Sequence, residues 1–208
     1  PPHLTNYSEF QKFMRSLQQA GSIQSIREVW WDIRPHPGYG TVEIRAFDCV
    51  PDLKQMVRIA AFAQTLVVAL SQHYDDGTQL GFLDRWINEE NKWRAMRYGI
   101  DAQVIIDENG NQQPIIDSIN ELIDKLDNVS KEIKTNKYLK EISNHIDKNN
   151  TPYKIQETIY NKSNNYQDII KNNISVLKNS IYDWNNSETE EDDQKTMVIL
   201  SMKNPSRI

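Results

Sequence analysis

Cysteine, excess basic charge and long apolar runs are all scarce in this 208-residue sequence. Cys49 is the only cysteine, so no intrachain disulfide can form. The net charge of -5 gives no general reason to expect a nucleic-acid partner. The richest apolar stretch, residues 59–70, is interrupted by Gln64 and is shorter than the roughly 20 residues that cross a bilayer. With no basic and apolar leader at the start either, we expect a cytoplasmic protein without a membrane partner.

Several catalytic sequence patterns are also missing. The chain has no phosphate-binding P-loop, no G-x-G-x-x-G dinucleotide fingerprint, no H-E-x-x-H zinc motif and no G-x-S-x-G nucleophile turn. Its four histidines have no metal-ligand spacing: His3, His36, His73 and His145. Zinc enzymes, nicotinamide enzymes and serine hydrolases are therefore disfavoured.

A charged hairpin is predicted at residues 28–48, EVWWDIRPHPGYGTVEIRAFD. Apolar and polar residues alternate on both sides of a loop rich in Pro and Gly, residues 35–40, which predicts two antiparallel strands. The expected pairing places Arg34 opposite Thr41.

This pairing also places Asp32 opposite Glu43. Four charged side chains then share one face of the hairpin: Asp32, Arg34, Glu43 and Arg45. Two opposed carboxylates repel each other unless a cation lies between them, which suggests a site for a metal ion or a polyanion. A solvated ladder of ion pairs is the alternative that these residue types leave open.

Helical periodicity dominates the remaining sequence. The expected helical ranges are 7–20, 52–73, 83–98, 114–148 and 152–184. The second of these is apolar nearly all round, so we expect it to be deeply buried beneath the sheet. A further hairpin with Asn109-Gly110 at its turn is predicted near residues 102–116, and Pro114 favours an edge strand or a helix entry. Strands and helices in mixed order indicate an α+β fold with an antiparallel sheet covered by helices.

A second group of polar residues lies on the helix predicted over residues 83–98. Glu90, Arg94 and Arg97 recur at helical spacing, and Asn91 lies beside them. Two arginines near a helix end could hold a carboxylate or phosphate through paired hydrogen bonds. An ion pair between Glu90 and Arg94 on a solvated helix is the plainer interpretation.

The segment WWDIRPHPGYGTVEIRAFD, followed later by ENKWRAMRYGIDA, closely resembles the C-terminal half of bacterial type 2 glutamate–cysteine ligases and related carboxylate-amine ligases. The resemblance extends over about residues 3–181. It implies that residues 1–184 are the C-terminal part of a catalytic domain with a glutamine-synthetase-like sheet, mainly helical after about residue 113. We expect residues 185–208 to form an acidic, disordered tail.

The resemblance also implies chemistry and residue roles. These ligases use ATP and Mg²⁺ to activate a carboxylate as an acyl phosphate, most simply the glutamate γ-carboxylate, which then joins the amine of cysteine in glutathione biosynthesis. By this resemblance Glu43 is a metal ligand, Arg45 acts on the transferring phosphoryl group, and Asp32 and Arg34 support them. Three residues match a further substrate-binding or nucleotide-binding block: Asn91, Arg94 and Arg97.

The expected activity also depends on the length of the chain, because complete members of the resembled family are longer than these 208 residues. Members of the family carry further metal and nucleotide ligands in an N-terminal portion, so we expect that missing half as a partner and expect the 208 residues alone to be inactive. The alternative is a non-catalytic module for nucleotide binding or assembly. The sequence leaves the amine substrate and a homo-oligomeric state open.

Overall fold

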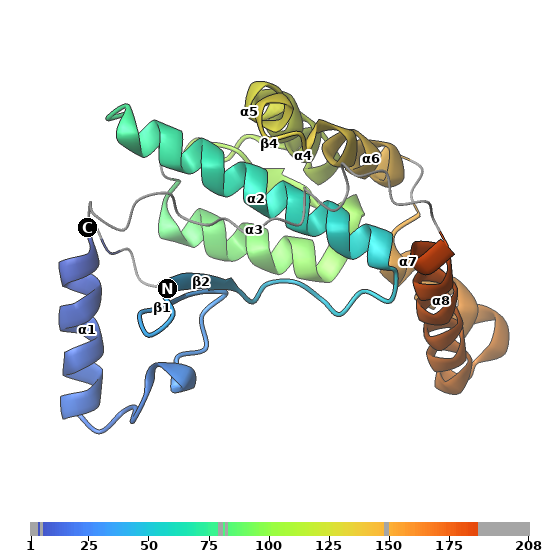
Figure 1. Cartoon of the computed structure of the whole chain (residues 1–208), viewed down its shortest axis with the longest axis horizontal. Coiled ribbons are helices and arrows are strands. Elements are labelled where there is room, and N and C mark those ends of the chain that lie inside the picture. The colour runs from blue at the N-terminus through green and yellow to red at the C-terminus, as the bar shows by residue number, and fades with distance from the viewer. Residues whose placement is uncertain (1–3, 5, 79–80, 82, 148–149, 187–208) are drawn as a thin grey trace. The chain divides into compact units, whose positions relative to one another are not determined.

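The computed structural model describes residues 4, 6–78, 81, 83–147 and 150–186. It divides into two compact units, Pro1–Cys49 and Val50–Ile208, and each is described by itself (Figure 1). Most of the described chain is helical, and two small antiparallel sheets of two strands each complete it. This agrees with the predicted α+β class. The predicted acidic tail lies outside the described residues from residue 187 onward.

In the first unit, helix α1 (Tyr7–Gln19) matches the predicted helix to within a residue. Its N-cap is Asn6, whose side chain accepts a hydrogen bond from the backbone N–H of Glu9 at 3.0 Å. The buried Phe10 turns its ring edge-on toward Trp31, with 6.4 Å between ring centroids. This aromatic contact anchors α1 to the segment that leads into the first strand.

Strands β1 (Ile33–His36) and β2 (Thr41–Ile44) form the predicted hairpin, but with a different register. Arg34 lies opposite Glu43, so the predicted pairing of Arg34 with Thr41 is wrong by two residues. The reason is Pro35, which stays in the strand opposite Val42 and does not enter the loop.

Proline is tolerated at this strand position because of the hydrogen-bonding pattern. The backbone N–H of Arg45 donates to the carbonyl of Asp32 at 2.6 Å, which makes that pair and every second pair after it a hydrogen-bonded one. Pro35 and Val42 therefore form a non-hydrogen-bonded pair. The missing N–H of Pro35 costs no ladder bond there.

The second unit begins with α2 (Leu53–Asp75), which is capped by the side chain of Asp52. Only three of its residues are buried, and they follow each other at intervals of four: Ala61, Thr65 and Ala69. The expectation of burial on all sides is therefore wrong, because the described helices cover one face only. Val67 is 48% exposed and Leu70 is 42% exposed.

Length and composition alone would allow α2 to cross a membrane. A helix packed on one side of a globular unit passes the same test. Figure 1 shows α4 (Ile115–Lys125), α5 (Asp127–Glu132) and α6 (Asn136–Asp147) gathered along one side of α2.

The core of the second unit lies between these helices. It is formed by Ala69, Ile123, Leu126 and Leu139. Beside it the hydroxyl groups of Thr65 and Thr135 are fully buried and share a hydrogen bond of 2.6 Å. The buried hydroxyl of Thr65 on α2 is thus paired with that of Thr135, which directly precedes α6.

Helix α3 (Arg85–Tyr98) ends at Gly99, as predicted, and leads through a short 3-10 turn into β3 (Gln103–Ile105). Gly99 has a φ of +57°, and a Cβ atom there would overlap the phenol ring of Tyr153. The hydroxyl group of Tyr153 accepts a hydrogen bond from the N–H of Ile100 at 3.1 Å. Glycine is required here by conformation and by space together.

Strand β4 (Gln112–Pro114) pairs with β3 across the predicted Asn-Gly turn, and Gly110 has a φ of +80°. Pro114 ends β4 and directly precedes α4, so it serves both as an edge residue and as a helix entry. This second hairpin is confirmed.

Helices α7 (Pro152–Ser163) and α8 (Tyr166–Asn186) pack on each other, and α8 also contacts α2. The single helical range predicted over residues 152–184 is divided into these two helices, and α8 continues two residues beyond it. A stripe of α8 is left exposed at residues spaced three and four apart: Ile170, Ile174, Leu177 and Ile181.

Candidate functional site

The centre of the candidate site is the cross-strand pair of Arg34 and Glu43. The Nε atom of Arg34 donates to Oε2 of Glu43 at 2.6 Å, and Nη2 lies 2.5 Å from the same oxygen. The side chain of Arg34 is 6% exposed, whereas that of Glu43 is 42% exposed. The register explains the contact, because it places the two residues directly opposite each other.

The other end of the Arg34 guanidinium is bound to backbone. Its Nη1 atom donates to the carbonyl of Arg27 at 3.0 Å and approaches the carbonyl of Val29 at 3.4 Å. These carbonyls lie in and after a single 3-10 turn, Ile26–Glu28. Arg34 therefore ties this turn to β2 and holds the carboxylate of Glu43 in one orientation.

One carboxylate oxygen of Glu43, Oε1, is not contacted by Arg34. Both contacts with Arg34 go to Oε2, and within the described part of the chain no hydrogen bond to Oε1 is formed. A half-exposed carboxylate oxygen on a fixed strand fits Mg²⁺, which binds through one or two carboxylates together with waters and substrate phosphates. Among the described residues no group of three His, Cys, Asp or Glu side chains could hold a metal ion, so a metal ion at Glu43 would need its other ligands from elsewhere.

Arg45 and Asp32 flank this pair. They lie opposite each other at the end of the hairpin, joined by the backbone hydrogen bond from Arg45 to Asp32. The Arg45 guanidinium lies 5.0 Å from the ring centroid of Trp30, which is 81% exposed. Asp32 therefore faces an arginine and not Glu43, so the predicted repulsion between opposed carboxylates is wrong. Alternation along the strands still gathers the four charged residues on one face, as predicted.

A pocket of about 330 Å³ adjoins the Arg34–Glu43 pair. It is lined by Arg27, Arg34, His36, Tyr39, Thr41 and Glu43. The ring of His36 stacks on Tyr39 with 4.5 Å between centroids. The Nδ1 atom of His36 is buried and has no hydrogen-bond partner within the described residues.

The sequence-based prediction missed four of these lining residues: Arg27, His36, Tyr39 and Thr41. His36 could have been found, because it lies two positions after Arg34 and so on the same strand face. Tyr39 is brought over His36 by the loop, and Arg27 is contributed by the 3-10 turn. Neither Tyr39 nor Arg27 has a spacing relative to the charged residues that would mark it in the sequence.

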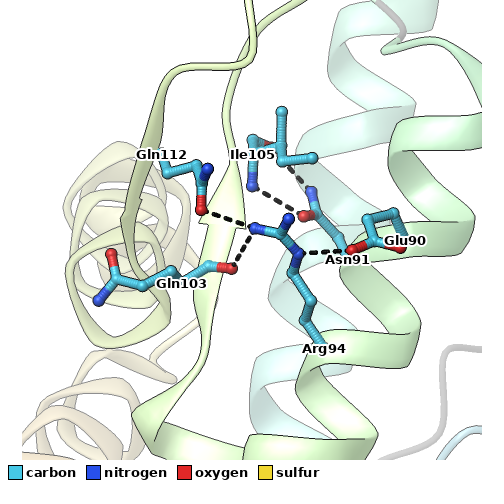
Figure 2. Close-up of polar contacts among 6 residues, drawn as sticks. All are labelled: Glu90, Asn91, Arg94, Gln103, Ile105 and Gln112. Atoms are coloured by element: carbon cyan, nitrogen blue, oxygen red, sulfur yellow. Dashed lines mark hydrogen bonds and ion pairs between the residues drawn. The ribbon is translucent and has the colours of Figure 1, made fainter.

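In the second predicted group, on α3, Asn91 and Arg94 form hydrogen bonds to the neighbouring hairpin (Figure 2), and Asn91 also lines a pocket of about 540 Å³. The side-chain amide of Asn91 makes two hydrogen bonds to Ile105, accepting from its N–H at 2.8 Å and donating to its carbonyl at 2.7 Å. In this way Asn91 substitutes for a neighbouring strand and pairs with the main chain of β3.

Arg94 makes three contacts in the same region. It donates to Glu90 at 2.8 Å, to the carbonyl of Gln103 at 3.1 Å and to the side-chain oxygen of Gln112 at 2.7 Å. Figure 2 shows its guanidinium between α3 and the hairpin of β3 and β4. Arg97 differs, since it is exposed and lies 5.8 Å from the ring centroid of Tyr98. Asn91 and Arg94 thus join α3 to the hairpin of β3 and β4 within the second unit.

Comparison with known proteins places these motifs in a family. The model of the glutamate-cysteine ligase family 2 (GCS2) matches residues 1–168. The Thermobifida fusca protein named "Putative glutamate--cysteine ligase 2" is 48% identical over 126 residues, which are 61% of this chain and 32% of that protein. A Bdellovibrio bacteriovorus protein of the same name is 31% identical over 181 residues, which are 87% of this chain and 48% of that protein.

The chain thus spans between a third and a half of the length of these curated relatives. The matched region contains the hairpin of β1 and β2 and the whole of α3. The chain belongs to the glutamate-cysteine ligase family 2.

Proposed function

We propose that this chain forms part of the active site of an ATP-dependent carboxylate-amine ligase. In the reaction, a carboxylate oxygen of glutamate attacks the γ-phosphorus of ATP and releases ADP. The amine of cysteine then attacks the acyl phosphate, forms the amide bond and releases phosphate. Membership of the family supports the ligase class, and the substrates are the simplest ones consistent with the names of the relatives.

The observation that carries the proposal is the Arg34–Glu43 pair. Arg34 fixes one carboxylate oxygen of Glu43 and leaves Oε1 available on a strand that cannot easily move. Bound Mg²⁺ would neutralise charge on the nucleotide phosphates. Glu43 would hold it through that oxygen, while Arg34 acts as the positioning residue that keeps the carboxylate oriented.

Arg45 is the proposed catalytic residue on the same face. Its guanidinium is exposed and held over Trp30, which restricts its motion without consuming its hydrogen-bond donors. A positioned arginine stabilises the negative charge that develops during phosphoryl transfer. Asp32, opposite Arg45, would help to orient it.

In the second unit we propose different roles for the three polar residues of α3. Asn91 and Arg94 position the hairpin of β3 and β4 through the contacts shown in Figure 2. Arg97, with its exposed guanidinium, is the proposed contact for an anionic group of the substrate or nucleotide.

The catalytic domain is proposed to be a glutamine-synthetase-like sheet to which this chain contributes only some strands. The remaining metal ligands would come from residues outside these 208. Support for this is the share of the relatives that the chain spans. We therefore expect the chain alone to bind nucleotide without turnover, and we expect the complete enzyme to be cytoplasmic.

Calorimetric titration with ATP, with and without Mg²⁺, tests this function. The chain should bind ATP in a Mg²⁺-dependent way, Glu43→Ala should abolish the Mg²⁺ dependence, and Arg45→Ala should weaken binding by about tenfold. Thr41→Ala, on the same face of β2 but without charge, serves as the control. ADP release by the 208 residues with glutamate and cysteine would refute the partial site, and nucleotide binding without any effect of Mg²⁺ would refute the role of Glu43.

A further inference from the structure

The pocket of about 540 Å³ in the second unit is lined by residues of β3, β4 and α4 together with Asn91. Its volume lies within the range of small-molecule sites. The amide of Asn91 is already bonded to the main chain of Ile105 (Figure 2). The apolar part of the lining is formed by Val104, Ile105, Ile106 and Ile115. A ligand in this pocket would therefore meet an apolar surface and the polar side chains of α4.

Two opposite charges of α4 line this pocket without neutralising each other. Glu121 precedes Lys125 by four residues, which is the favourable order and spacing for an ion pair on a helix. Within the described residues neither side chain forms an ion pair. Three other pairs at the same spacing do form in this chain: Arg85–Glu89, Glu90–Arg94 and Asp127–Lys131. Both charges at the pocket are thus available to a ligand that carries both signs.

Ser118 adds a hydrogen-bond donor to the same face of α4. Ser118, Glu121 and Lys125 follow each other at intervals of three and four residues, so they lie on one side of the helix. The side-chain amide of Gln113 donates to Oγ of Ser118 at 2.8 Å. A hydroxyl that accepts one hydrogen bond still has its own hydrogen to donate. The pocket therefore offers an anionic acceptor, a neutral donor and a cationic donor in one row.

We propose that this pocket binds a free α-amino acid with an apolar side chain. Its ammonium group pairs with Glu121, and its carboxylate pairs with Lys125 and the hydroxyl of Ser118. Its side chain covers Ile106, which is 42% exposed, and removes apolar surface from water. An anion or a cation alone fits less well, because it would meet a like charge on the next turn of α4. This site goes beyond the proposed ligase function and does not depend on it.

The first test is an NMR titration of the 208-residue protein, labelled at its isoleucine methyl groups, with L-leucine. The signals of Ile106 and Ile115 should shift in a saturable way, because both residues line the pocket. The signal of Ile174, which is exposed on α8 outside the pocket, should not move. Absence of saturable shifts at Ile106 and Ile115, or equal shifts at Ile174, would overturn the proposal.

The second test pairs each charged residue with a ligand analogue. Glu121→Gln should raise the Kd of L-leucine by about fivefold but leave that of N-acetyl-L-leucine, which has no ammonium group, within about twofold. Lys125→Gln should raise the Kd of L-leucine by about fivefold but leave that of L-leucinamide, which has no carboxylate, within about twofold. Both residues are exposed, so neither replacement disturbs the fold.

The matched controls are Asp124→Asn and Lys140→Gln. These residues carry the same two charges, are exposed in the same unit and lie outside the pocket. Both variants should bind L-leucine within about twofold of the wild type. Equal losses in the controls, or equal losses for L-leucine and its analogue in a pocket variant, would refute the assigned contacts. The outcome is distinct from that of the ligase test, which measures ATP binding and replaces residues of the first unit.

Discussion

Arg34 and Arg94 are the same residue type, each is paired with a glutamate, and each donates to backbone carbonyls, yet they organise different things. Arg34 pairs across two strands with a half-exposed carboxylate that borders a pocket. Arg94 pairs with Glu90 within its own helix and donates its other hydrogen bonds to residues of β3 and β4. The partners of an arginine therefore decide whether it fixes a carboxylate beside a pocket or only joins two elements.

The largest loss of stability is expected from a substitution at Gly99, which directly follows α3. Gly99→Ala should lower the free energy of unfolding by about 3–5 kcal/mol, because the new Cβ would meet the Tyr153 ring at a residue with a φ of +57°. Thermal unfolding followed by circular dichroism measures this. Tyr153→Phe is the control, since it removes only the hydrogen bond to Ile100 and should cost about 1 kcal/mol.

If Gly99→Ala unfolds like the wild type, the region around α3 is looser than its contacts indicate. The role of Arg94 as a structural tie would then need revision. A loss of stability with unchanged Mg²⁺-dependent ATP binding would sharpen the comparison, because the Arg34–Glu43 pair lies wholly within the first unit.

The next largest effect is expected from conservative replacement of the two arginines. Arg34→Lys should cost about 2–3 kcal/mol, because a lysine cannot bond Glu43 and the carbonyls of the 3-10 turn together from a buried position. It should also reduce Mg²⁺-dependent ATP binding. Chemical denaturation and the ATP titration provide the two measurements.

Arg94→Lys is the matched variant. It should cost only about 1 kcal/mol, because the side chain is 21% exposed and the i to i+4 contact with Glu90 can persist. ATP binding should be unchanged. A stronger loss of ATP binding in Arg94→Lys than in Arg34→Lys would reverse the distinction drawn between the two arginines.

Asn91 offers a smaller test of the same region. Asn91→Ala removes two hydrogen bonds and leaves the N–H and the carbonyl of Ile105 without their partner, so stability should fall by about 2 kcal/mol. Asn91→Asp keeps the acceptor but replaces the donor with an anionic oxygen that faces the carbonyl of Ile105, so near neutral pH it should cost at least as much as Asn91→Ala. Urea unfolding measures both losses, and wild-type stability in either variant would contradict the pairing of Asn91 with the β3 main chain.

The smallest effect concerns the turn between β3 and β4. The side-chain hydrogen bond from Asn111 holds the pKa of Asp107 below its ordinary value of 3.8. Because the folded state favours the ionised carboxylate, its contribution to stability is present above pH 3.8 and is lost as the pH falls through the lower folded value. Unfolding measured from pH 7 to pH 2 should show this loss in the wild type and not in Asp107→Asn; parallel curves would contradict it.

Much of the secondary structure could be predicted from the sequence. The Asn-Gly turn and the glycine after α3 require a positive φ, and each marks its element without help from the rest of the fold. The burial of α2 could not be predicted, because composition shows that a helix is apolar but not which side its neighbours cover. Only the positions Ala61, Thr65 and Ala69 are buried.

The candidate site was predicted in its residue types but not in its geometry. Glu43 and Arg34 were found because acid and arginine recur at strand spacing. Their direct contact depends on a register that alternation alone does not specify. The pocket depends on Arg27, which the 3-10 turn brings to the hairpin.

The position of Pro35 has a consequence for how the hairpin reaches a single alignment. A slip of one residue would bring the proline to a hydrogen-bonded position, where its missing N–H would break the ladder and every side chain would change face. A slip of two residues would satisfy the proline but would set Asp32 against Glu43. The missing N–H of Pro35 thus disfavours the odd misalignment and like-charge repulsion disfavours the even one, so the charged residues of the candidate site also help to select the strand register.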